Sequence, residues 1–248
     1  MRISRGAALA VHFVLDACLP PILRDQPWFI WLPFRMLFGR HARTFMEFKD
    51  RALELDDEAF LRVYRETAGV HVRRETDLNA ACLARIADRV EGPRVLEVGC
   101  GRGHLAGILG RRHEVTACDI AIDADARARH AHVRFVEGNV QRLPFADRSF
   151  DTVVCTHTLE HVQRLDAAVR ELRRVAARRL IVVVPRQRPQ RYTFDLHLHF
   201  FPLPHMLLER FPADASVANR RIDCVGGDWF YEEWRTREAA VDGVITAA

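Results

Sequence analysis

From residue 76 to residue 185 the sequence alternates short apolar runs with amphipathic segments. A short apolar run without polar alternation is typical of a strand that is buried on both faces. The pattern predicts five such strands, at residues 94–98, 114–119, 133–136, 150–155 and 179–184. The amphipathic segments are predicted as helices at residues 76–89, 104–111, 123–130 and 165–177. This alternation favours an α/β fold with a doubly wound, mostly parallel sheet.

The two ends of the chain differ from this regular middle. After residue 185 the alternation becomes irregular, and we predict that residues 219–225 and 229–234 close the sheet as an antiparallel pair, which gives seven strands. Residues 1–75 are helical in pattern, rich in aromatic side chains and interrupted by prolines. We therefore predict an N-terminal helical extension over residues 1–75, followed by one domain over residues 76–248.

The N-terminal extension has three interpretations. It covers the domain that follows, it forms the contact of a homodimer, or it lies on a membrane surface. Residues 7–38 suit the third interpretation, because tryptophan and phenylalanine stand there beside arginine, a combination that suits the headgroup boundary. A cover over the domain and a membrane contact are compatible with each other.

Composition excludes several classes of protein. The net charge of +4 is too mild for a chain built to bind a nucleic-acid backbone, so we expect no nucleic-acid partner. The six cysteines form no Cys-x-x-Cys pair, so the sequence predicts neither a metal centre nor a disulfide framework. No apolar run approaches the roughly 20 residues of a spanning helix. We expect a cytoplasmic protein with reduced thiols, which a peripheral membrane contact would not contradict.

A glycine-rich loop follows the first predicted strand. Gly99, Gly101 and Gly103 stand at alternate positions between that strand and a helix. Glycines there let the backbone turn sharply and approach a ligand closely, at the sheet edge where doubly wound folds bind ligands. Asp119 ends the second strand, where a carboxylate can accept both hydroxyls of a ribose. The order strand, glycine loop, helix, strand and aspartate therefore predicts a nucleoside-binding site.

Two nucleoside ligands compete for such a loop. A dinucleotide site usually has the spacing Gly-x-Gly-x-x-Gly and faces a pyrophosphate. Here the third glycine comes one residue early, and Glu97 lies in the strand just before the loop. A carboxylate there repels a pyrophosphate but suits the cationic amino-acid part of S-adenosyl-L-methionine. We therefore favour S-adenosyl-L-methionine over a nicotinamide dinucleotide.

Four segments resemble motifs of a known family. Residues 95–103 resemble motif I of the class I S-adenosylmethionine-dependent methyltransferases, and residues 137–145 resemble the segment that borders adenine. Residues 149–154 and 156–162 resemble the fourth strand and its loop. Together they are similar to the type 11 branch, which includes the ubiquinone and menaquinone biosynthesis methyltransferases. The resemblance covers residues 76–185 and implies a Rossmann-like methyltransferase fold.

The resemblance also implies cofactor contacts. Glu97 would lie near the methionine ammonium, and Asp119 would hold the ribose with Ile120 against the adenine face. The other implied contacts are the loop residues Gly99, Cys100, Gly101 and Gly103, the adenine-edge residues Asn139 and Val140, and Thr156 and His157 at the sulfonium end. Asn139 stands where most family members carry aspartate, but its carbonyl oxygen can still accept a hydrogen bond.

A general base is needed only where the methyl acceptor carries a proton. The catalytic candidates are His157, Asp195, His197 and His199. The last three alternate along the chain and would share one face if they form a strand. They lie in residues 186–235, where the resemblance implies the acceptor pocket. His161 is interpreted as structural.

The sequence thus predicts an enzyme that transfers a methyl group from S-adenosyl-L-methionine. The acceptor is a small molecule, a lipid-like precursor or a glycan, since no nucleophile or aromatic module typical of nucleic-acid methylation is present. The aromatic N-terminal extension favours a lipid-like acceptor. One alternative is a non-catalytic partner subunit that keeps the cofactor pocket, and another is a nicotinamide oxidoreductase.

Overall fold

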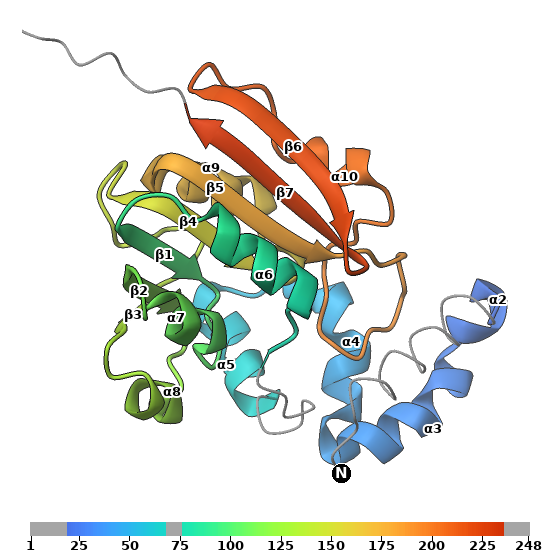
Figure 1. The fold of residues 1–248 in the computed structure, drawn as a ribbon. Helices are drawn as coiled ribbons and strands as arrows, with labels where there is room; N and C mark the ends of the chain where they lie inside the picture. Colours follow the sequence, from blue (N-terminus) through green and yellow to red (C-terminus); the bar gives the residue numbers. More distant parts are fainter. Residues whose placement is uncertain (1–18, 68–75, 236–248) are drawn as a thin grey trace, which may run out of the picture.

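The computed structural model describes residues 19–67 and 76–235, and a single sheet organises them (Figure 1). Its seven strands run in the order β3-β2-β1-β4-β5-β7-β6. The five parallel strands are β1 (Arg94–Val98), β2 (Glu114–Asp119), β3 (Arg134–Glu137), β4 (Phe150–Thr156) and β5 (Ala176–Pro185). The antiparallel pair β6 (Val217–Val225) and β7 (Asp228–Arg235) closes the sheet beside β5. The predicted mostly parallel, seven-stranded α/β fold is confirmed.

Helices cover both faces of the sheet. Successive side chains of a strand point to opposite faces, and β1 accordingly sends Leu96 into one hydrophobic core and Val95 into another. The first core includes Leu172 of α9, and the second includes Ile86 of α6. The helices of this domain are α6 (Ala80–Arg89), α7 (His104–Leu109), α8 (Ala124–Arg129), α9 (Leu165–Val175) and α10 (Pro204–Leu208), with the 3₁₀ turn η3 (Leu159–His161) after β4.

Among the helix boundaries that differ from the predicted ones, two have clear local reasons. The helix predicted from residue 76 begins at Ala80, because the Asn79 side chain accepts a hydrogen bond from Cys82 N at 2.8 Å and caps the helix. The helix predicted to residue 177 ends at Val175, because Ala176 already pairs with Phe150 as the start of β5.

The N-terminal extension forms a third core together with the loop that follows β5. Its helices are α2 (Pro21–Arg24), α3 (Pro27–Phe38), α4 (Ala42–Ala52) and α5 (Asp57–Thr67), with the 3₁₀ turn η2 (Gly39–His41). The core stacks Phe38 on Phe45 at 3.8 Å between ring centroids and buries Tyr192 and Leu196 of the loop. In Figure 1, α4 and α5 lie beside the carboxyl ends of the parallel strands.

The extension thus contacts the domain through the loop after β5. The apolar stretch at residues 7–19, which the sequence also predicts to be a helix, lies almost wholly outside the described residues. None of the helices within residues 19–67 and 76–235 is long and apolar enough to cross a membrane.

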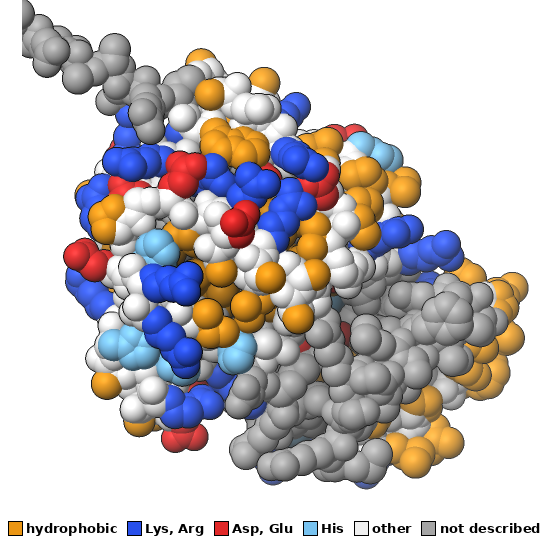
Figure 2. All heavy atoms as spheres, viewed as in Figure 1, with side chains coloured by type: hydrophobic (Ala, Val, Ile, Leu, Met, Phe, Trp, Pro, Cys, Tyr) orange, Lys and Arg blue, Asp and Glu red, His pale blue; other side chains and the backbone are white. Residues whose placement is uncertain are grey.

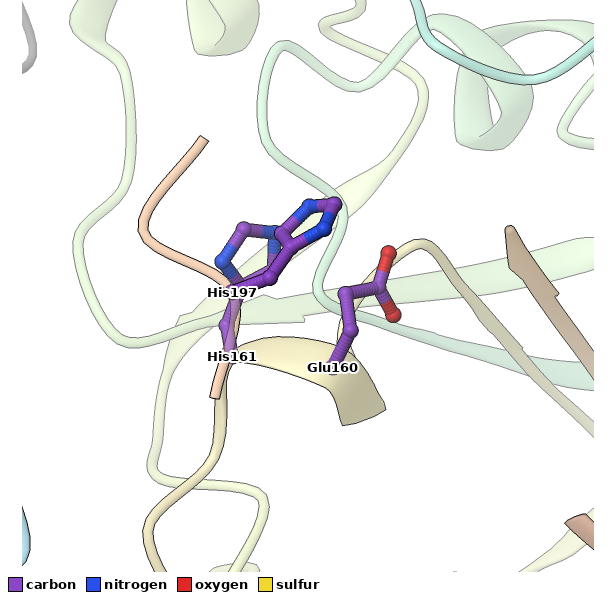
Figure 3. A group of neighbouring side chains, drawn as sticks. All are labelled: Glu160, His161 and His197. Atoms are coloured by element: carbon purple, nitrogen blue, oxygen red, sulfur yellow. The ribbon is translucent and has the colours of Figure 1, made fainter. Parts of the chain in front are cut away.

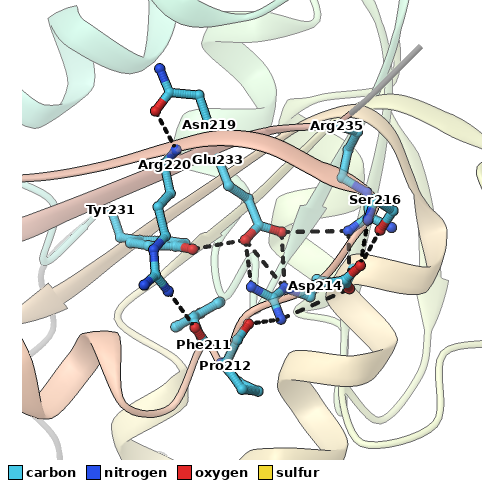
Figure 4. A network of polar contacts seen from close by, with 10 residues as sticks. Phe211, Pro212, Asp214, Ser216, Asn219, Arg220, Tyr231, Glu233 and Arg235 are labelled. Carbon is cyan, nitrogen blue, oxygen red and sulfur yellow. Dashed lines mark hydrogen bonds and ion pairs between the residues drawn. The ribbon is translucent and has the colours of Figure 1, made fainter.

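A buried ionic network joins the closing strands to the helix behind them (Figure 4). Arg173 of α9 donates to Glu233 of β7 from Nε at 3.0 Å and from Nη2 at 2.8 Å. The Tyr231 hydroxyl donates to the same carboxylate at 2.7 Å, and Arg173 Nη1 donates to the Pro212 carbonyl at 2.9 Å. Because Glu233 is fully buried, this set of donors replaces the water that the carboxylate loses on folding.

Candidate functional site

A cavity of about 390 Å³ lies at the carboxyl ends of β1, β2 and β4. Its wall includes Glu97 of β1, Asp119 of β2 and Thr156 of β4. The strand order reverses between β1 and β4, because the chain first builds outward from β1 to β3 and then continues on the other side. Doubly wound sheets bind their ligands at this reversal point.

The glycine loop forms the floor of the cavity in a backbone conformation that favours glycine. Gly99 and Gly101 have φ values of 75° and 49°, in the left-handed region. A Cβ on Gly99 would also collide with the Thr158 side chain, whereas one on Gly101 would meet open space. Gly99 N donates to Cys118 O at 2.8 Å, which fixes the start of the loop. The loop therefore keeps its backbone close to whatever occupies the cavity.

Two carboxylates line the cavity in different environments. Glu97 is 3% exposed, and its Oε2 accepts no hydrogen bond from the described residues. Burial raises its pKa to about 8. Burial also raises the pKa of Asp119, although the backbone N–H of Gly101, which donates to Asp119 Oδ2 at 2.7 Å, opposes this shift. Glu97 is thus a buried acid with no cation beside it among the described residues. Asp119 is an acid that the glycine loop orients through a backbone hydrogen bond.

The part of the cavity wall next to β2 and β3 combines apolar surface with an amide. Ile120 and Val140 contribute apolar surface, and Asn139 contributes an amide. Asn139 Oδ1 accepts hydrogen bonds from Gln141 N at 2.9 Å and from Gln141 Nε2 at 3.2 Å. The carbonyl oxygen that was expected to face adenine therefore already has two donors from its own loop.

His157 occupies the tip of β4 between two acids. It has a φ of 48°, an unusual value for a residue with a side chain. Its Nδ1 lies 3.6 Å from Glu160 Oε1 and its Nε2 lies 3.5 Å from Asp228 Oδ2. Burial lowers the pKa of His157, but the two acids outweigh it and raise the pKa to about 10. At neutral pH His157 is an imidazolium, which argues against its predicted role as a general base.

The side of the cavity opposite the loop is aromatic and comes from the N-terminal extension. Phe60 and Tyr64 of α5 line it, together with His161 of η3. The Tyr64 and His161 rings meet edge to face at 6.0 Å between centroids. Burial raises the pKa of the Tyr64 hydroxyl, so it stays protonated. The extension thus contributes side chains to the cavity wall.

The family assignment agrees with this geometry. Residues 96–183 match a family model described as "Methyltransferase domain". Over this segment the chain is similar to methyltransferase domains. The segment runs from the middle of β1 to near the carboxyl end of β5. It therefore contains the strand ends that line the cavity. The resemblance to S-adenosylmethionine-dependent methyltransferases is confirmed for this part of the chain.

Curated relatives of the methyltransferase domain have diverse acceptors in their names. A fatty-acid O-methyltransferase from Mycolicibacterium smegmatis is 36% identical over 141 residues, which are 50% of this chain and 51% of that protein. A ubiquinone/menaquinone biosynthesis C-methyltransferase from Rubrivivax gelatinosus is 33% identical over 95 residues, which are 37% of this chain and 38% of that protein. The chain spans about half the length, or less, of the curated relatives it matches.

Solved structures share the fold. A structure titled as an S-adenosylmethionine-dependent methyltransferase from Thermotoga maritima aligns with a TM-score of 0.53 at 18% identity, over 72% of this chain and 98% of that chain. At this identity the likeness shows the fold alone.

The cavity wall contains groups whose chemistry suits S-adenosyl-L-methionine. A buried carboxylate without a partner suits a ligand ammonium, and a carboxylate at the β2 tip suits ribose hydroxyls. Most of the predicted cofactor residues line one cavity: Glu97, Gly99, Cys100, Gly101, Asp119, Ile120, Asn139, Val140, Thr156 and His157. Gly103 is behind the wall, where its positive φ of 70° begins α7 and a Cβ would meet the Phe135 ring.

The predicted catalytic residues after β5 are arranged differently from the expectation. Residues 195–199 form a loop, and Leu196 has a φ of 54°, so the three polar side chains do not share the face of a strand. His197 Nδ1 lies 2.6 Å from Gln187 Oε1, whereas His199 Nε2 donates to the Val162 carbonyl at 2.8 Å. None of Asp195, His197 and His199 belongs to the cavity wall.

Sequence reasoning missed several residues of the site. Thr158, Gln141 and Tyr64 line the cavity, and His161, interpreted as structural, lines it too. A signal for one of them was present, because Phe60 and Tyr64 are four residues apart in the N-terminal extension, which is helical in pattern, and residues at that spacing share a helix face. No spacing in the sequence indicated that His161 would meet His197, whose ring lies 4.6 Å away between centroids.

Proposed function

We propose that the protein transfers a methyl group from S-adenosyl-L-methionine to a small, largely apolar acceptor. The observation that carries this proposal is that the buried Glu97, whose Oε2 accepts no hydrogen bond from the described residues, and the loop-held Asp119 line one cavity of ligand size. The cofactor, when bound, supplies an activated methyl group on a sulfonium. The nicotinamide alternative loses support, because Glu97 would face a pyrophosphate.

The residues of the chain bind and orient the reactants. Glu97 holds the ammonium of the methionine moiety, and Asp119 accepts from the ribose hydroxyls. Ile120 and Val140 cover the adenine faces, while Asn139 contributes at the adenine edge. Methyl transfer requires alignment and the exclusion of water more than acid–base chemistry. The aromatic side formed by Phe60 and Tyr64 provides that exclusion.

The acceptor is best described as lipid-like. The cavity side next to the acceptor is built from aromatic residues of α5, and the loop after β5 packs on the same helices in one core. Relatives named as a fatty-acid O-methyltransferase and as a ubiquinone/menaquinone biosynthesis C-methyltransferase support an apolar acceptor that is methylated on oxygen or carbon. We therefore keep residues 186–235 as the acceptor side and residues 1–75 as its cover.

A thermal-shift experiment tests the cofactor. We expect S-adenosylhomocysteine to raise the melting temperature of the full chain and NAD to leave it unchanged, since a ligand at 100 times its Kd stabilises by about 2.7 kcal/mol. Asp119→Ala removes most of the shift, whereas the matched control Asp125→Ala, at an exposed acid of α8, keeps it. An Asp119→Ala variant with the full shift would contradict the ribose assignment.

A turnover experiment separates catalysis from cofactor binding alone. The chain is incubated with S-adenosyl-L-methionine labelled in its methyl group and with fatty acids, quinone precursors and small phenols. We expect label in at least one of these apolar acceptors. Tight binding of S-adenosylhomocysteine with no labelled product from any of them favours the non-catalytic partner subunit.

We also propose that α2 and α3 contact a membrane surface. Their exposed side chains are large and apolar, including Trp28 at 69%, Leu32 at 63% and Met36 at 78% exposure. Figure 2 shows hydrophobic side chains gathered along this edge. The exposed Arg35 stands among them, and a basic apolar helix suits anionic lipids. A homodimer contact is the other interpretation of this face.

Co-sedimentation with vesicles tests that contact. We expect the full chain to sediment with anionic vesicles and a Trp28→Ser/Leu32→Ser/Met36→Ser variant to stay in the supernatant. Leu53→Ser, which removes an equally exposed apolar side chain after α4, is the matched control. The membrane contact is excluded if all variants sediment equally with the vesicles. It is also excluded if the full chain is a dimer that the triple variant converts to a monomer.

A further inference from the structure

Three side chains with metal-ligand chemistry meet at the edge of the cavity. Glu160 and His161 come from η3, and His197 comes from the loop after β5. Each offers one ligand atom, and these atoms lie within 4.8 Å of one another. Figure 3 shows the two imidazoles close together, with the Glu160 carboxylate beside them. Residues 36 positions apart in the chain thus converge on one point.

Backbone hydrogen bonds enforce this meeting. Leu198 N and His199 N donate to the Glu160 carbonyl at 2.7 Å and 3.0 Å. The His199 ring donates to the Val162 carbonyl at 2.8 Å, so the loop is held to η3 on both sides of His161. The buried Leu196, with its φ of 54°, makes the turn that directs the loop there. The backbone of η3 and of the loop after β5 therefore fixes the cluster, which does not depend on one flexible side chain.

Glu160 lacks the partners that its burial demands. Its side chain is fully buried, and neither carboxylate oxygen accepts a hydrogen bond from the described residues. The nearest cation is the imidazolium of His157, at 3.6 Å from Oε1, and Asp228 shares that cation. A buried carboxylate costs several kcal/mol unless it is paired or coordinates a metal. Oε2 is left for a further positive ligand.

His197 has the hydrogen-bond pattern of a metal-binding imidazole. Its Nδ1 faces the Gln187 carbonyl oxygen at 2.6 Å, so this nitrogen carries the proton and donates. Nε2 then keeps its lone pair. Histidines that bind metals almost always donate their other ring N–H to a carbonyl or carboxylate in this way. Gln187 is itself buried, at 8% exposure, so the donor–acceptor pair is fixed.

We infer that Glu160, His161 and His197 form a binding site for one divalent transition-metal ion, for which Zn²⁺ is the probe. Two imidazoles and one carboxylate are a ligand set that suits Zn²⁺ and related ions better than Mg²⁺, which prefers oxygen ligands. Three protein ligands leave a coordination position open. His161 lines the cavity, so the open position faces the space assigned to the acceptor. An oxygen of the acceptor can then bind the ion and be oriented by it.

Calorimetric titration of the metal-stripped full chain with ZnCl₂ tests the site independently of methyl transfer. We expect one Zn²⁺ per chain. Glu160→Gln and His197→Gln each weaken binding at least tenfold, and Gln187→Ala, which removes only the supporting acceptor, weakens it about 10- to 100-fold. The matched control His205→Gln, at an exposed histidine of α10, leaves the affinity unchanged.

Two further measurements make the outcome unambiguous. Thermal melts of the metal-free variants identify any that do not fold, and Co²⁺ in place of Zn²⁺ reports imidazole ligation through its visible spectrum. Absence of saturable Zn²⁺ binding overturns the inference, as does an affinity that Glu160→Gln and His197→Gln both leave intact. Saturable Mg²⁺ binding without Zn²⁺ binding also overturns it, because the imidazoles would then not be ligands.

Discussion

Glu233 and Glu160 are both fully buried, yet the protein surrounds them differently. Glu233 accepts hydrogen bonds from Arg173 and Tyr231, so its charge is matched within the fold. Glu160 accepts none from the described residues and shares one imidazolium with Asp228. The first arrangement joins β7 to α9, whereas the second borders the cavity. A matched buried acid contributes to stability, and an unmatched one indicates a place for a ligand.

The largest effect is expected at the matched acid. Glu233→Gln removes the carboxylate that is hydrogen-bonded to the buried Arg173 and leaves only Asp214, at 4.0 Å, so we expect the free energy of unfolding to fall by about 3–5 kcal/mol. Urea unfolding measures it. Glu47→Gln, in an exposed pair with Arg43 at 3.5 Å, is the control and should cost less than about 0.5 kcal/mol. Equal costs for the two variants would remove the contrast between the two regions.

The next effect is expected at Glu97, the buried acid in the wall of the cavity. With its pKa raised to about 8, Glu97 is largely neutral at pH 7 and must release a proton to pair with an ammonium. S-adenosylhomocysteine should therefore bind more tightly, with proton release, as pH rises from about 6 to about 8. Glu97→Gln should weaken binding by about 1.5–3 kcal/mol and remove the pH dependence. Calorimetry in buffers of different ionisation enthalpy counts the protons.

A third effect is a pH dependence of stability that arises at His157. Its folded pKa of about 10 lies above the ordinary value of 6.5, because Asp228 and Glu160 outweigh burial. The stability it contributes is therefore fully present below about pH 6.5 and is lost as pH rises through about 10. We expect the wild type to lose more stability over this range than His157→Gln does, as measured by thermal melts across the pH range. Parallel curves would show that His157 is not held protonated by these acids.

The smallest effect is expected at the unmatched acid itself. Glu160→Gln removes no hydrogen bond made by the described residues, and Asp228 still pairs with His157. In metal-free protein we expect the free energy of unfolding to change by about 1 kcal/mol or less. Urea unfolding beside Glu233→Gln gives a direct comparison. A loss as large as that of Glu233→Gln would mean that Glu160 is a structural partner and would weaken the ligand interpretation.

The sheet and the cofactor pocket were predictable because both depend on local patterns. Apolar runs gave β1, β2 and β4, and parallel strands bring their carboxyl ends to one edge whatever the loops do. Gly99, Glu97 and Asp119 stand at or beside those ends, so their meeting followed from strand order. The antiparallel pair after β5 was also predicted, from two short segments at residues 219–225 and 229–234 on either side of a tight turn that contains Gly226 and Gly227.

The acceptor side was not predictable at the same level. Alternation at residues 195–199 suggested a strand, but Leu196 adopts a positive φ and the next two amides donate to the Glu160 carbonyl. Nothing in the local pattern encodes a hydrogen bond to a residue almost 40 positions away. The predicted role of His157 as a base changed similarly, because its pKa depends on Asp228, which only the antiparallel pairing of β7 brings to the β4 tip.

The amino-acid sequence by itself determined the order of strands and helices and the chemistry of the glycine loop, because hydrophobic periodicity and glycine positions act over a few residues. Only the tertiary structure decided which side chains face one another across the cavity. Those encounters depend on loop paths, and a loop path is fixed by distant backbone hydrogen bonds and by packing on the N-terminal helices. The difference between the matched and the unmatched buried acid can therefore be recognised in the tertiary structure but not in the sequence pattern.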